Sequence, residues 1–181
     1  MARLTPITDK KQVAPKDHAV VDGILASRGA LQGPFTMFLH SPELAGRAAH
    51  LGAYVRFEGS LDMRVRVLAA MTVAREFEAL YVWGAQTSGA RKQNVPESTI
   101  TAIREKHTRG VPPEDAQIIE FTRTLLTKHR VDDATAAAMR KRFGDDEFIQ
   151  LTGAIGYYSL LCMTVNACEL EAGPGHEVLK V

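Results

Sequence analysis

The sequence predicts an all-α protein with one domain. Apolar residues recur three and four positions apart in almost every segment, the spacing that places them on one face of a helix. No segment alternates apolar and polar residues between hairpin turns, as a half-buried strand would. The 181 residues suffice for one domain with a real core and are too few for two. We therefore expect a helical bundle of residues 15–172, with an arm at 1–14 and a tail at 173–181.

The composition is that of an ordinary soluble globular protein, with 45% hydrophobic and 24% charged residues. A net charge of +1, without long runs of Lys or Arg, predicts no nucleic-acid partner and no anionic membrane partner. The polar N-terminus lacks the apolar segment of a signal peptide. Together with only two cysteines, these features predict a cytoplasmic protein with reduced thiols.

Proline and capping residues mark the first helices. Pro15 suits the first turn of a helix that ends near residue 28. Ser41, Pro42 and Glu43 then provide a capping hydroxyl, a proline at the first helical position and an acid in the first turn. These residues predict a second helix that continues to about residue 56.

The centre of the chain predicts two consecutive helices, 63–75 and 76–92. Asp62 is placed to cap the first of them, and we expect Arg64 and Arg66 on its polar side. The second has little of the polarity of a surface helix, which favours a buried position for it.

The rest of the chain predicts three amphipathic helices and one long apolar helix, at residues 96–106, 114–129, 132–143 and 146–168. The last of these is about long enough to cross a bilayer. It also contains Gln150, Asn166 and several hydroxyl groups. This mixture favours burial between helices or in a subunit interface, so no membrane partner is expected.

The sequence lacks the motifs of metal-binding, dithiol and nucleotide-binding sites. No two of the six histidines are three or four residues apart, and neither a Cys-x-x-Cys pair nor a nucleotide-binding glycine loop occurs. Cys162 lies in an apolar run, where burial raises the pKa of a thiol. The sequence therefore predicts no metal and no cofactor.

The helix expected at 76–92 carries the main candidate residues. Glu78, Tyr81 and Gln86 are spaced to line one cavity, because residues three and four apart share a helical face. Trp83 lies within the same two turns. His40, in a short apolar turn, is the one candidate whose side chain titrates near neutral pH.

Tyr157 and Tyr158 on the last helix are placed to meet these residues. Each candidate also has a structural alternative, as a core aromatic residue, a surface acid, a turn histidine or a buried amide that joins two helices.

Four stretches follow one another between Gly33 and Glu171: GPFTMFLHSPELA, RFEGSLDMRVRVLAAMTVAREFEALYVWGAQ, ARKQNVPESTITAI and FIQLTGAIGYYSLLCMTVNA. In this order and spacing they resemble the carboxymuconolactone decarboxylase family, whose superfamily also contains alkylhydroperoxidase D. The resemblance implies an all-α fold, a homo-oligomer (trimer or hexamer) and active sites near subunit contacts.

Three departures from the family pattern bear on the chemistry. Val67 occupies the place of a family Glu, and the pattern Tyr-Glu-Trp-x-x-His is altered by Val82 and Gln86. The Cys-x-x-Cys pair of the alkylhydroperoxidase branch is missing. A glutamine exchanges hydrogen bonds but takes up no proton at neutral pH.

The resemblance implies a decarboxylase-like enzyme of lyase, isomerase or hydrolase type. It would act without metal or redox thiols on a small carboxylate or lactone derived from an aromatic compound. Gln86 and Tyr81 would bind the oxygen that gains charge, and His40 or Glu78 would move the proton. Substrate would also contact a second group: Trp83, Val82, Tyr157 and Tyr158.

Two alternatives remain open. The first is a non-catalytic protein that binds a ligand or supports an assembly on the same fold. The second is a residual, peroxiredoxin-like peroxidase that uses Cys162 or Cys168.

Overall fold

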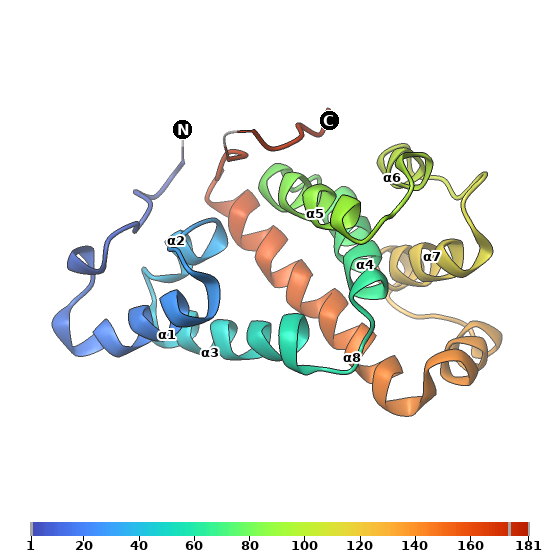
Figure 1. Ribbon diagram of the computed structural model, residues 1–181, viewed down its shortest axis with the longest axis horizontal. Helices are drawn as coiled ribbons and strands as arrows, with labels where there is room; N and C mark the ends of the chain where they lie inside the picture. Colours follow the sequence, from blue (N-terminus) through green and yellow to red (C-terminus); the bar gives the residue numbers. More distant parts are fainter. Residues whose placement is uncertain (1, 174, 181) are drawn as a thin grey trace.

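The computed structural model describes residues 2–173 and 175–180, and most of this part of the chain is helical (Figure 1). This part contains eight α-helices and no strand, which confirms the predicted fold class. The helices are α1 (His18–Arg28), α2 (Pro34–Phe38), α3 (Pro42–Ala53), α4 (Met63–Glu76), α5 (Leu80–Lys92), α6 (Glu97–Arg104), α7 (Pro113–Lys128) and α8 (Asp133–Ala167). Short 3₁₀ turns occur at Lys10–Gln12 and Pro15–Asp17, and a π-helical turn, Tyr54–Glu58, extends α3.

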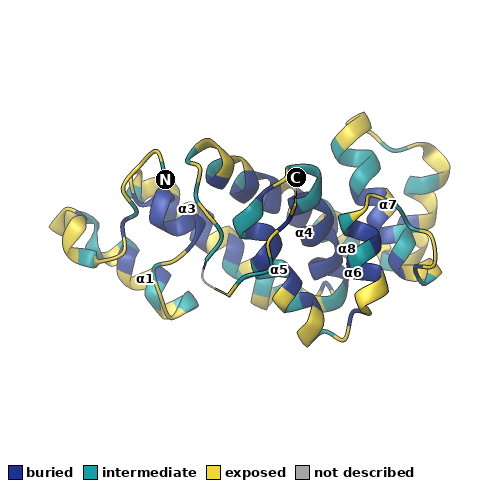
Figure 2. Cartoon of the chain, turned by 90° about the horizontal axis from the view of Figure 1, so that it is seen from above, coloured by how far each residue is buried: buried dark blue, intermediate teal, exposed yellow. Residues whose placement is uncertain are grey.

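Helix α8 runs through the middle of the molecule, with α1–α3 on one side and α4–α7 on the other (Figure 1). Helix α4 packs against α5, α7 and α8 and forms the centre of the core. All ten of its residues from 65 to 74 are buried, as the dark blue of α4 in Figure 2 shows. A helix surrounded on all sides needs apolar residues all round, and VRVLAAMTVA nearly provides them.

One residue of α4 breaks that pattern. The Asp62 carboxylate caps the helix as predicted, since it accepts hydrogen bonds from the N–H groups of Arg64 and Val65 at 2.8 and 3.2 Å. The expected polar position of Arg66 is wrong, because its side chain points into the packed interior and is 9% exposed. The helix therefore buries a cation.

A tight turn separates α4 from α5. Glu78 has a left-handed backbone (φ 53°), and Ala79 is extended. The Asn166 side-chain amide donates to the Phe77 carbonyl oxygen at 2.6 Å and ties this turn to the end of α8. The predicted start of α5 at residue 76 is therefore four residues too early, and Glu78 lies outside the helix.

The two helices expected at 132–143 and 146–168 are joined into α8. Gly144 has φ 70° and ψ 177° and produces a kink. By length and composition alone, α8 passes the test for a membrane span, and half of its most apolar window is buried inside the protein. A core helix passes the same test, and Ala154 and Ile155 are among the core residues that α8 supplies.

Both ends of the chain pack on the bundle. In the arm, Ile7 and Val13 are buried, and the Ile7 N–H donates to the Thr36 carbonyl oxygen at 3.0 Å. In the tail, Leu179 is buried and His176 packs against Gly84, where an added Cβ would lie 2.6 Å from the His176 Cβ. The arm and the tail thus cover parts of the core.

Candidate functional site

A cavity of about 160 Å³ lies where the first helices meet α5 and α8. The end of α1, the start of α2, the π-helical turn, α5 and α8 all contribute to its wall. The lining residues are Arg28, Gln32, Pro34, Phe35, Arg56, Tyr81, Val82, Ala85, Gln86, Tyr157, Tyr158 and Leu161. Five residues that the sequence singled out are thereby brought together: Tyr81, Val82, Gln86, Tyr157 and Tyr158.

Helix α5 presents one face to this cavity because its four lining residues are three and four positions apart or adjacent. The Gln86 side chain is half-buried and makes no hydrogen bond with the residues that the structure describes. The Tyr81 ring covers Gly33 so closely that an added Cβ there would lie 2.4 Å from Cε1. Burial raises the pKa of Tyr81, so its phenol remains a hydrogen-bond donor at neutral pH.

Helix α8 provides two buried tyrosines, which are 3% and 1% exposed and pack edge to face with ring centroids 5.5 Å apart. The Tyr158 hydroxyl oxygen accepts a hydrogen bond from Nη1 of Arg66 at 2.9 Å. Burial raises the pKa of Tyr157, although the neighbouring Arg28 and Arg56 oppose this effect. Both rings line the cavity.

Two arginines complete the polar part of the wall. Arg28 donates to the Ala49 carbonyl oxygen at 3.1 Å and to the Ser27 hydroxyl at 2.6 Å, and its guanidinium stacks 4.1 Å from the Phe35 ring centroid. Arg56 stacks 4.7 Å from the ring centroid of Phe57. Neither forms an ion pair with a carboxylate in the described part of the chain.

Three predicted site residues lie elsewhere. His40 is exposed and contacts the Thr5 carbonyl oxygen at 2.9 Å. Glu78 is exposed and pairs with Arg75 at 3.3 Å, because the turn before α5 directs it away from the cavity. Trp83 is fully buried, 5.7 Å from the guanidinium of Arg104, and does not line the cavity, which leaves its expected contact with substrate without support here.

Arg28, Arg56 and Gln32 have no sequence signature of a site residue. The two arginines lie at the expected ends of helices, and Gln32 belongs to a loop without periodicity. Arg66 did carry a usable signal, since it is the one charged residue within the apolar run from Val65 to Ala74.

The cavity donates hydrogen bonds but has no group that titrates near neutral pH. Its wall contains no acid, histidine or cysteine. In the described residues, no group of three or more His, Cys, Asp and Glu side chains is arranged to hold a metal ion. Phenols, guanidinium groups and an amide suit an oxygen atom that carries or gains negative charge.

The thiols lie apart from this site. Cys162 is buried, and burial raises the pKa of its thiol well above the usual range. Cys168, at the end of α8, is half-buried, and neither cysteine lines the cavity.

Comparison with solved structures identifies the fold. A peroxidase-related protein from Ralstonia eutropha JMP134, described as an alkylhydroperoxidase AhpD core, is 14% identical with a TM-score of 0.78 over 96% of this chain and 93% of its own. The debrominase Bmp8, solved as a cysteine-to-alanine variant with 2,3,4-tribromopyrrole, is 15% identical with a TM-score of 0.75 over 96% and 95%. A peroxidase-related protein from Silicibacter sp. TM1040 is 13% identical with a TM-score of 0.75 over 97% and 93%.

These similarities establish an AhpD-like fold along nearly the whole chain. No protein-family model matches the sequence, and no curated protein matches it.

Proposed function

We propose that the protein is an enzyme that acts on a small oxygenated compound, a carboxylate or lactone derived from an aromatic compound, in the cavity between α5 and α8. The observation that carries this proposal is the unpaired Gln86 amide beside Tyr81 and Tyr157 on one cavity wall. Three neutral donors around one space stabilise an oxyanion without needing a metal or a redox thiol.

The size of the cavity is consistent with a planar ring. A volume of about 160 Å³ is close to that of a cavity known to hold benzene, about 150 Å³. The debrominase with the same fold was solved with 2,3,4-tribromopyrrole, which is also a small planar ring. This likeness of fold supports a ring-sized ligand for the present cavity.

Decarboxylation illustrates the chemistry that we propose. The bond to the departing carboxylate breaks, its electron pair passes to an adjacent carbonyl oxygen, and CO₂ leaves. The Gln86 amide and the Tyr81 phenol would donate hydrogen bonds to the resulting enolate oxygen. The carbon would then take a proton from water, because no lining side chain titrates near neutral pH.

Replacement of Gln86 by alanine tests the proposal. We expect turnover of a responsive substrate, found among aromatic-derived carboxylates and lactones by mass spectrometry, to fall about 10²–10³-fold, as on loss of one oxyanion donor. Gln117→Ala on α7, outside the cavity wall, is the control and should leave turnover unchanged. Equal turnover in the Gln86→Ala and wild-type proteins would place the chemistry elsewhere.

A non-catalytic binding protein is the second candidate, because the cavity wall contains no titrating acid or base. It predicts that a ligand bound in this cavity is recovered unaltered after prolonged incubation. Turnover that disappears in the Gln86→Ala variant would exclude it.

We also propose a homo-oligomer, through the outward face of α8. This face carries Ile149, Gly153, Gly156, Leu160 and Met163, which follow one helical stripe. Ile149 and Met163 are 65% and 52% exposed, and an added Cβ at either glycine would meet no atom within 4 Å. We expect Gly156→Glu to lower the molar mass in light scattering toward the 19.8 kDa of one chain, and a wild-type protein of that mass would refute the proposal.

A further inference from the structure

We infer that the cavity selects an anion, a small planar carboxylate whose oxygens bind Arg28 and Arg56, with Tyr158 as a third donor that Arg66 positions. This inference rests on the proposed function and decides between its two substrate types, a charged carboxylate and a neutral lactone. Three of the residues that it names, Arg28, Arg56 and Arg66, were not among the site residues expected from the sequence.

Charge is the first argument. Most other arginines of the described chain pair with carboxylates, among them Arg64 with Asp115 and Arg123 with Glu76. Arg28 and Arg56, which line the cavity, and Arg66, which donates to the lining residue Tyr158, have no such partner in the described residues. In a chain with a net charge of +1, this is a local concentration of positive charge.

Part of this positive charge is also buried. The Arg28 Nε is buried and has no hydrogen-bond partner, and Arg66 is 9% exposed. Removing a cation from water without a compensating charge is unfavourable, and an anion in the cavity would offset that cost. A neutral lactone would leave these cations uncompensated.

The hydroxyl group of Tyr158 can also donate a hydrogen bond to a ligand. The Tyr158 oxygen already accepts from Arg66, and the structure shows no acceptor for its own proton among the described residues. The ring lines the cavity, so the O–H bond is free to donate to a ligand oxygen. Arg66 is thereby a positioning residue, and Tyr158 touches the ligand.

The remaining wall suits the body of such a ligand. Phe35, Val82 and Leu161 are apolar and buried, and they lie with Pro34 and Ala85 around the same space. An apolar wall with a cationic end fits an aromatic ring that carries one carboxylate.

Benzoate and benzamide are the probes, since they share a planar ring and differ in charge. We expect calorimetry on the full chain to show benzoate binding about tenfold or more tighter than benzamide, because hydrogen bonds to charged groups are the stronger ones. Acetate, which lacks the ring, and inorganic phosphate should bind more weakly than benzoate. Equal affinity for benzoate and benzamide, or no saturable binding of benzoate, would overturn the inference.

Variants assign the effect to the arginines. Arg56→Met should weaken benzoate binding about tenfold and leave benzamide unchanged, and it removes no hydrogen bond from the described fold. Arg47→Met is the matched control, because it removes the same charge from an exposed pair with Glu43. Unchanged benzoate affinity in Arg56→Met would refute the assignment.

The Gln86→Ala variant separates this inference from the proposed function. If the Gln86→Ala variant loses turnover and still binds benzoate, both the proposed enzyme function and the anion site are supported. If no compound is turned over and benzoate binding still depends on Arg56, the enzyme proposal fails while the anion site stands.

Discussion

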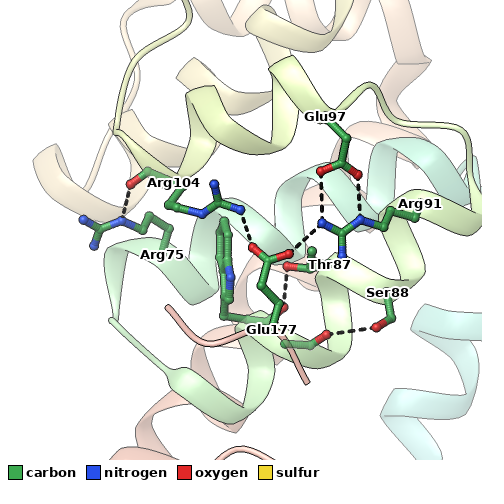
Figure 3. A network of polar contacts seen from close by, with 9 residues as sticks. Arg75, Thr87, Ser88, Arg91, Glu97, Arg104 and Glu177 are labelled. Atoms are coloured by element: carbon green, nitrogen blue, oxygen red, sulfur yellow. Dashed lines mark hydrogen bonds and ion pairs between the residues drawn. The ribbon is translucent and has the colours of Figure 1, made fainter. Parts of the chain in front are cut away.

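Two groups of arginines in this protein differ in their partners, because one group binds carboxylates and the other contacts only neutral groups. Beside the tail, Arg91 donates to Glu97 at 2.6 Å and to Glu177 at 2.6 Å, and Arg104 also binds Glu177 (Figure 3). Around the cavity, the guanidinium groups contact carbonyl oxygens, hydroxyls and rings, and none forms an ion pair in the described chain.

The presence or absence of a carboxylate partner distinguishes arginines that stabilise the fold from arginines that we propose bind a ligand. The paired group joins α5, α6 and the tail, and the charges of its two arginines are neutralised by two carboxylates of the same chain. Arg28, Arg56 and Arg66 gain no such stabilisation, although Arg66 is among the most buried cations of the protein. Because a cation that is removed from water without a carboxylate partner is costly, this arrangement is consistent with the anion site that we propose.

The largest effect should follow from breaking the ion pair that has the most buried carboxylate. Arg64→Met would leave the Asp115 carboxylate, 3% exposed, without the cation that it meets at 2.6 Å. We expect a loss of about 3 kcal/mol in the free energy of unfolding, measured with denaturant, since an unpaired buried charge remains. Arg47→Met, at a pair that is 79% and 78% exposed, should change stability by less than about 1 kcal/mol. Equal effects at the two sites would contradict this distinction.

A smaller effect is expected where the tail meets α5 and α6. Burial opposes ionisation of Glu177, but hydrogen bonds from Arg91 and Arg104 outweigh it, and the net effect lowers the pKa of Glu177. Its stabilising contribution is therefore present above the unfolded pKa of about 4.3 and is lost as the pH falls through the lower folded value.

Glu177→Gln should accordingly cost about 1 kcal/mol at pH 7 and progressively less below about pH 4. Glu169→Gln is the matched control, because Glu169 pairs with Arg3 at an exposed site. Denaturation followed by the fluorescence of Trp83, the only tryptophan, measures both variants. A loss that persists unchanged at low pH would show that the ion pairs are not its cause.

The sequence predicted the architecture well, because helical periodicity and capping are local. Asp62 caps α4 and Pro42 begins α3, as their positions predicted. Ser41 precedes α3 as predicted, but its side chain makes no capping hydrogen bond with the helix. Glu78 was misplaced because a left-handed residue other than glycine has no sequence signature.

The sequence singled out the cavity residues that lie on two helices, α5 and α8, and missed those on the other elements. Tyr81, Val82 and Gln86 share a face of α5, and periodicity is enough to group them. Arg28 and Arg56 reach the cavity from separate elements, and only tertiary packing brings them together. Periodicity alone does not assign a face to the cavity, which is why Trp83, which does not line the cavity, was included.

The smallest effect on stability is expected for Arg66→Met, and this makes it the sharpest comparison with Arg64→Met, the same change two residues away on α4. No carboxylate is left unpaired, and an apolar side chain of similar length replaces a buried cation. We expect a change within about 1 kcal/mol of zero, or a gain in stability. Benzoate should stabilise this variant less than the wild type, because Tyr158, which lines the cavity, loses the donor that orients its hydroxyl. If Arg66→Met is instead as unstable as Arg64→Met and binds benzoate normally, Arg66 belongs with the arginines that hold the fold.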